Sequence, residues 1–250
     1  MLEELLTTLA VLFLLPIFPF SMLSNFILSK FKGLMLLFVL SSMFFTGALL
    51  LSSYENQTVI VAISVVALFS TMFYALRLLS VSHAYSYLIF YYSTISGFAW
   101  LWKSVDGEMS VFFIAFILPI IGFGFLVAFL DKQFKTTYFK AFKGLGNVMP
   151  RFSVLLVISI VALIFTPYFP GFRIFIEEVV KFDIYYLIAI VISWLLISWS
   201  GITLIEKLIY GVAQRKLHYR DLSPLQTIFL VFLYLLSVGI GFIFMEVNLG

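Results

Sequence analysis

The sequence predicts an all-α fold, a polytopic transmembrane helical bundle of about eight spans. The 250 residues are 63% hydrophobic and only 11% charged, whereas soluble chains are typically about 25% charged. The charged side chains gather in short clusters, and residues 33–53 contain none at all. Since a bilayer core about 30 Å thick is crossed by roughly 20 apolar residues in a helix, these charge-free stretches predict membrane spans.

The charge-free stretches define the expected spans in chain order. They cover residues 5–28, 33–53, 58–79, 83–102, 109–130, 152–172, 184–206 and 223–246. Glu3 and Glu4 precede the first stretch, where a signal peptide would carry basic residues, so we expect this stretch to be retained. The spans leave no room for an extramembrane domain, which predicts a single transmembrane domain over residues 1–250.

The loop charges predict an orientation. Basic side chains gather in the first, third, fifth and seventh loops, whereas the even loops are acidic or mixed. Because cytoplasmic loops are enriched in Lys and Arg, we expect the basic loops in the cytoplasm and both termini outside. An even number of spans places the two termini on the same side, in agreement with the charges.

The fifth loop, residues 131–151, is the longest and is strongly basic. Lys132, Lys135, Phe139 and Lys143 recur at near-helical intervals, as in an amphipathic helix lying along the inner membrane surface. The alternative is a basic loop that only determines topology. The sequence leaves both alternatives open.

A helix break is expected near Pro167, Pro170 and Gly171, because proline frees a backbone carbonyl and discontinuous helices often line ion paths in transporters. Charged residues follow directly. Ion-path candidates are therefore Glu177, Glu178 and Lys181, with Glu177 and Lys181 spaced to pair on one helical face. The alternative is a solvated loop with ordinary ion pairs.

Arg77 and His83 are further ion-path candidates beside a short turn. An ionisable group within the bilayer is costly and so needs a reason. For His83 a structural role at the membrane interface is favoured over a proton relay, since the residue lies at the end of an expected span.

The sequence contains no pattern for bond-making chemistry. Hydrolase elbows, phosphate loops, HExxH and GxGxxG motifs are lacking, and there is no cysteine. We therefore expect no catalytic site, no metal site and no cofactor. The pI near 9 follows from topology and does not indicate nucleic-acid binding.

Several phrases, taken in order, resemble antiporter-like proton-pumping subunits of respiratory complex I, membrane hydrogenases and multisubunit cation/proton antiporters. The phrases are PIFPF at 16–20, YYSTISG at 91–97, GLGNVMP at 144–150, PYFPGF at 167–172, LIEKLIYG at 204–211 and DLSP at 221–224. The resemblance implies a subunit surrounded by other integral membrane subunits, in the inner (plasma) membrane of a prokaryote.

The chain also departs from this family. Members are usually about twice as long, and their buried lysines would fall near Met43 and Phe44 and within residues 112–125, which are apolar here. Only Glu177 or Glu178 matches the charged residue that follows the PYFPGF-like phrase. The relay of buried charges is therefore depleted.

Three functions remain open. The first is a structural or coupling subunit of a larger redox-linked or ion-translocating complex, such as a non-catalytic subunit of a NADH-quinone oxidoreductase-like or hydrogenase-like complex. The second is a transporter subunit that forms an ion or bicarbonate path with a partner or as a homo-oligomer. The third is a membrane anchor for a soluble protein.

Overall fold

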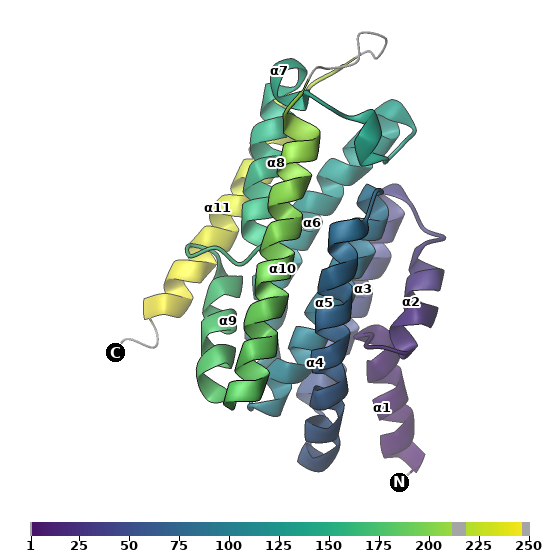
Figure 1. Ribbon diagram of the computed structural model, residues 1–250, viewed down its shortest axis with the longest axis vertical. Coiled ribbons are helices and arrows are strands. Elements are labelled where there is room, and N and C mark those ends of the chain that lie inside the picture. Colours follow the sequence, from purple (N-terminus) through teal and green to yellow (C-terminus); the bar gives the residue numbers. More distant parts are fainter. Residues whose placement is uncertain (1, 212–218, 247–250) are drawn as a thin grey trace.

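Helices make up nearly all of the chain. The computed structural model describes residues 2–211 and 219–246, and this part contains helices and connecting loops but no strand (Figure 1). The all-α prediction is therefore confirmed.

Five helices in the described part are long and apolar enough to cross a membrane. They coincide with five expected spans and are α3 (Gly33–Ser52), α4 (Gln57–Ser80), α6 (Met109–Phe134), α10 (Ile184–Ile209) and α11 (Pro224–Glu246). Helix α6 continues through Pro119 without a break.

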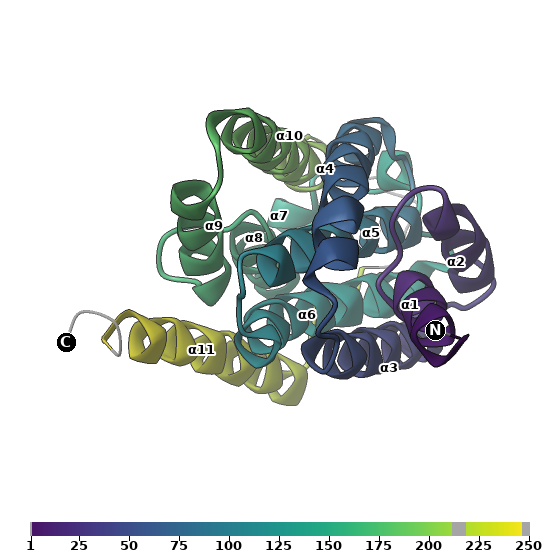
Figure 2. The same cartoon turned by 90° about the horizontal axis from the view of Figure 1, so that it is seen from below.

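Helix α5 (Ala84–Ser104) also coincides with an expected span but has a more polar composition, rich in Tyr, Ser and Trp. It lies inside the bundle, in contact with α4, α6, α3 and other helices (Figure 2). Every residue from Tyr87 to Trp102 is buried except Phe90, which is partly buried. A helix enclosed by protein can carry polar groups because its neighbours, and not lipid, supply their partners.

The first and sixth expected spans are interrupted. Residues 5–28 do not form one helix: α1 (Leu2–Leu14) ends before Pro16, and α2 (Phe20–Leu28) begins after Pro19. Likewise α8 (Pro150–Leu163) ends before Pro167, and α9 (Pro170–Lys181) runs past the expected end at residue 172. Proline lacks the amide donor that a continuing helix requires, which accounts for both interruptions.

The fifth loop forms no single amphipathic helix. Helix α6 extends into it as far as Phe134, and the rest holds only the short turn η1 (Phe139–Ala141) and the four-residue α7 (Leu145–Val148). Backbone bonds tie this loop to the start of α5, from Ala84 N to Thr137 O (2.9 Å) and from Phe139 N to Ser82 O (2.9 Å). The loop is thus a folded cover over one end of the bundle.

Counting α1 with α2 and α8 with α9, successive elements alternate in direction, which brings the basic loops to one end of the molecule and the N-terminus to the other (Figure 1). Close packing holds the helices together. A Cβ atom added at Gly97 of α5 would lie 2.0 Å from Thr71 Oγ1 and 3.0 Å from Ala67 O on α4, so α4 and α5 approach as closely as only a glycine permits.

Candidate functional site

The break between α1 and α2 leaves carbonyl groups without helical partners, and distant side chains bind them. Tyr92 on α5 donates to Leu14 O, and Trp100 Nε1, also on α5, donates to Leu15 O at 3.1 Å. An unpartnered carbonyl within a membrane costs several kcal/mol. These two donors therefore stabilise the interrupted helix.

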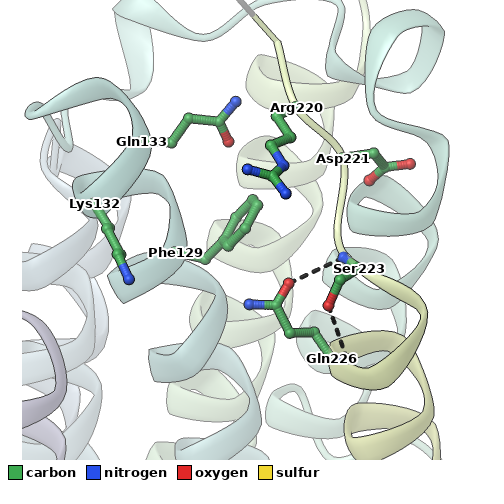
Figure 3. A pocket seen from close by; sticks show the side chains of 7 residues that line it. All are labelled: Phe129, Lys132, Gln133, Arg220, Asp221, Ser223 and Gln226. Atoms are coloured by element: carbon green, nitrogen blue, oxygen red, sulfur yellow. Dashed lines mark hydrogen bonds between the residues drawn. The ribbon is translucent and has the colours of Figure 1, made fainter.

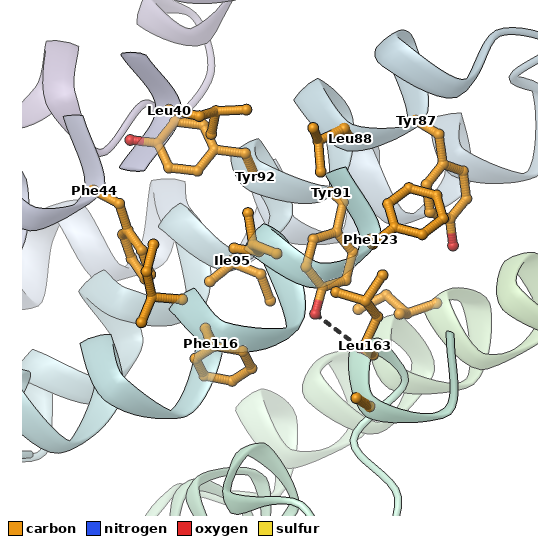
Figure 4. Close-up of a cluster of buried hydrophobic side chains, with 14 of the residues drawn as sticks. Leu40, Phe44, Tyr87, Leu88, Tyr91, Tyr92, Ile95, Phe116, Phe123 and Leu163 are labelled. Atoms are coloured by element: carbon orange, nitrogen blue, oxygen red, sulfur yellow. Dashed lines mark hydrogen bonds between the residues drawn. The ribbon is translucent and has the colours of Figure 1, made fainter. Parts of the chain in front are cut away.

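The break between α8 and α9 is completed in the same way. Tyr91 on α5 donates to Leu163 O at 2.8 Å (Figure 4), and Trp194 Nε1 on α10 donates to Ile164 O at 3.0 Å. Phe165 adopts the left-handed conformation, with φ of 57°, and this turns the chain out of the helix.

The two breaks share a sequence pattern, Pro-x-Phe-Pro, at Pro16–Pro19 and Pro167–Pro170. The sequence alone predicts a break at the second segment but places the first within a continuous span. The repeated pattern was the signal that would have identified the first. Helix α5 lies between both breaks and supplies donors to each.

A polar cluster of Ser21, Asn25, Ser70, Tyr74 and Ser93 lies beside the first break. Ser70 Oγ on α4 accepts from Phe18 N at 2.9 Å, Tyr74 donates to Ser21 Oγ at 2.7 Å, and Ser93 donates to Asn25 Oδ1 at 2.9 Å. The cluster joins α2, α4 and α5, and extends from the break toward the basic end of the bundle.

Arg77 lies at the outer edge of this cluster. It is exposed, and its guanidinium lies 5.2 Å from the Phe90 ring centre and 5.8 Å from that of Phe73. It lines a pocket of about 320 Å³ together with Asn25 and Tyr74. The structure thus places Arg77 next to buried polar groups that lead to a helix break.

His83 lies in a neighbouring pocket of about 320 Å³ that shares Ser29 and Ser86 with the pocket of Arg77. Its ring packs on Tyr138, with 3.5 Å between ring centres. In the same pocket Tyr85 donates to Asp131 Oδ2 at 2.8 Å and accepts from Gly33 N at 2.7 Å. Sequence reasoning missed Tyr85 and Asp131, which are 46 positions apart.

An aromatic row fills the centre of the bundle where the family resemblance implies charges. Successive ring centres lie 4.6 to 6.4 Å apart from α3 to α10, and the row consists of Phe44, Phe112, Phe116, Phe165, Phe175 and Trp194. All but Trp194 are buried. Packed rings leave no ionisable group in the row.

Glu177 forms a partly buried ion pair on α9, but not with the residue that the sequence suggested. Its Oε1 accepts from Arg173 Nε at 2.6 Å. Lys181 is exposed, and its ammonium lies 5.2 Å from the Trp102 ring centre. Glu177 is four residues from each cation, so spacing alone could not choose between them. The side chain of Glu178 lies outside the described residues.

The other predicted positions are at the break itself. Pro170 and Gly171 are buried at the start of α9, and Pro167 is exposed in the preceding loop. Among the described residues, His, Asp and Glu side chains form no group of three that could hold a metal ion.

Comparisons with known proteins support the fold. No family model matches the chain. An uncharacterized protein of Aquifex aeolicus (strain VF5) is 25% identical over 236 residues, which cover 90% of this chain and 95% of that protein.

Two solved structures are similar over nearly the whole chain. A chain of respiratory complex I from Thermus thermophilus with bound NADH has a TM-score of 0.80 at 15% identity over 95% of this chain. A chain of the membrane-bound sulfane sulfur reductase, an archaeal respiratory membrane complex, has a TM-score of 0.79 at 14% identity over 94%.

This chain spans only about half of those two chains, 54% and 51% respectively. The matched chains are membrane subunits of their complexes. The protein therefore has the fold of an antiporter-like membrane subunit of respiratory complexes, over about half the length of such a subunit.

Proposed function

We propose that the chain is an integral membrane subunit of a larger redox-linked or ion-translocating complex, with a structural or coupling role. The shared fold supports membership of such an assembly. Other integral membrane subunits are the proposed partners, and the proposed location is a prokaryotic inner membrane with the basic loops in the cytoplasm.

The aromatic row is the observation that carries the coupling role. Proton movement through a membrane subunit uses ionisable side chains inside the bundle. Here residues 33–53 and 109–130 contain none, and Phe44, Phe112 and Phe116 from these helices lie in the row. The two broken helices are retained, whereas the charges that would join them are replaced by packed rings.

The outer faces of the bundle are suited to membrane partners. Phe38 on α3 and Phe69 on α4 are each at least 70% exposed, and neither helix carries a charge along most of its length. Contacts between membrane helices depend chiefly on close packing, which these apolar faces allow.

Purification from native membranes in a mild detergent tests the proposal. We expect other integral membrane subunits to co-purify in fixed ratio, and mass spectrometry of the intact assembly identifies them. A lone, monodisperse oligomer that catalyses ion flux in liposomes would contradict the subunit role, and a bound soluble protein without membrane subunits would favour an anchor.

The ion pair on α9 gives a second test. Glu177→Gln should weaken assembly or coupling by less than about fivefold, because partly exposed ion pairs contribute about 0.2–1 kcal/mol. Glu206→Gln is the matched control, since Glu206 is exposed at the opposite end of the bundle. Complete loss of ion pumping in a normally assembled Glu177→Gln complex would instead assign Glu177 to the ion path.

A second candidate is a transporter subunit that forms an ion or bicarbonate path with a partner or a second copy. The polar cluster favours it, because Asn25, Tyr74 and Ser21 lead from the pocket of Arg77 to the first break. Asn25→Leu should abolish flux under this alternative, whereas under the coupling role it should only lower stability.

A further inference from the structure

A polar pocket of about 380 Å³ lies at the basic end of the bundle, where α6 ends and α11 begins (Figure 3). Its lining combines two cations, two amides, one carboxylate, one hydroxyl and one ring. The lining residues are Phe129, Lys132, Gln133, Arg220, Asp221, Ser223 and Gln226. Lys132 and Arg220 come from opposite walls. In the described part of the chain, neither cation has an ion-pair partner.

The one carboxylate of the pocket is already bound elsewhere. Asp221 accepts from three backbone amides, Arg151 N and Phe152 N at 2.9 Å each and Leu222 N at 2.8 Å. In Figure 3 its oxygens point away from the pocket. The Asp221 carboxylate therefore binds the amides at the start of α8. Lys132 and Arg220 then leave the pocket itself electropositive.

The start of α11 holds Gln226 in a defined position. Its Oε1 accepts from Ser223 N at 3.0 Å, while Ser223 Oγ accepts from Gln226 N at 3.3 Å, which is a capping box. With Oε1 bound in this way, the amide nitrogen of Gln226 is directed into the pocket (Figure 3). The pocket thus presents an amide donor beside two cations.

Below the pocket, α11 presents an apolar face. Phe229 lies one turn below Gln226 and packs on Phe125 of α6, with 5.9 Å between ring centres. Leu225, Phe229 and Phe232 are 80%, 49% and 65% exposed, at the spacing of one helical stripe. A lipid with an anionic headgroup in the pocket and alkyl chains along the apolar stripe of α11 would match both features. Basic pockets at the cytoplasmic ends of transmembrane helices bind anionic lipid headgroups in this way.

We propose that this pocket binds the phosphate of an anionic phospholipid, whose acyl chains lie along the exposed stripe of α11. Lys132 and Arg220 bind the phosphate oxygens from two sides, and Gln226 donates a further hydrogen bond. This site goes beyond the subunit role and is independent of which complex contains the chain.

Native mass spectrometry of the full chain, in the assembly in which it purifies, tests the site with phosphatidylglycerol and phosphatidylcholine as probes. We expect selective retention of phosphatidylglycerol. The Lys132→Gln/Arg220→Gln double variant should bind it about 25-fold more weakly, since each basic residue near a membrane surface contributes about a factor of five.

Lys140→Gln is the matched control. Lys140 is exposed at the same end of the bundle, on η1, and does not line the pocket, so this variant should retain wild-type lipid selectivity. Arg220→Lys should keep most of the binding. Helical circular dichroism and gel filtration establish that each variant is folded.

Three results would overturn the proposal. One is an equal loss of phosphatidylglycerol in Lys140→Gln and in the folded double variant, which would show a general surface charge effect. Another is equal retention of phosphatidylcholine by the wild-type chain. The third is tighter binding of inorganic phosphate than of phosphatidylglycerol, which would assign the pocket to a soluble anion.

Discussion

Tyr91 and Tyr92 are neighbours on α5, yet their hydroxyls bind carbonyls of two different interrupted helices. Adjacent residues of an α-helix point about 100° apart, so two consecutive tyrosines can serve two sides of one helix. Both side chains are fully buried, so each hydroxyl can bond only to the carbonyl that the packing places beside it.

Removing the Tyr91 hydroxyl should destabilise the protein. Tyr91→Phe keeps the ring but leaves Leu163 O without its donor, which should lower the free energy of unfolding by about 1–3 kcal/mol. Unfolding with SDS in mixed micelles measures the change. Tyr138→Phe is the control, since Tyr138 is 51% exposed, and a similar loss in both variants would contradict the argument.

Asp221 should contribute to stability through the start of α8. Asp221→Ala leaves the first amides of that helix without their acceptor, at a cost of about 0.5–2 kcal/mol. Asp183→Ala is a matched control, because Asp183 precedes α10 and its side chain makes no capping bond. Equal unfolding curves for the two variants would show that the contacts of Asp221 are unimportant.

At the scale of the elements, the packing of α4 on α5 depends on Gly97. Gly97→Ala would place a methyl group within 2.0 Å of Thr71 Oγ1, and overpacking of this kind typically costs about 1–3 kcal/mol. Gly239→Ala on α11 should be neutral or stabilising, because nothing lies within 4 Å of the added atom. The thermal midpoints of the two variants in detergent should therefore move apart.

The sequence predicted those helices whose formation depends on the composition of a single segment. Long charge-free stretches gave α3, α4, α6, α10 and α11, because span length and hydropathy are properties of one segment. The proline-rich phrase at 167–171 predicted the break between α8 and α9, because proline interrupts a helix within one segment.

The remaining features depend on contacts between distant residues. Tyr91 and Leu163 are 72 positions apart, and no spacing rule joins them. Glu177 has a cation four residues away in each direction, and only the folded environment selects Arg173. The first break was missed because Pro16 and Pro19 lie in a long apolar stretch without charged side chains.

At the scale of the whole molecule, the separation of basic and acidic loops predicts a testable orientation. The chain contains no cysteine, so a single introduced thiol reports one position. In intact cells, a membrane-impermeant maleimide should label Glu55→Cys but not Lys140→Cys, and both positions are exposed. Labelling of Lys140→Cys alone would reverse the topology.

The central position of α5 has a consequence for biosynthesis. Leu14 leaves the ribosome 78 residues before Tyr92, its donor, whereas Leu163 leaves 72 residues after Tyr91. When helix α5 is synthesised, the acceptor of Tyr92, Leu14 O, has already been made. The acceptor of Tyr91, Leu163 O, has not yet been translated. The donor for the first break is thus synthesised before the segment that contains the second break.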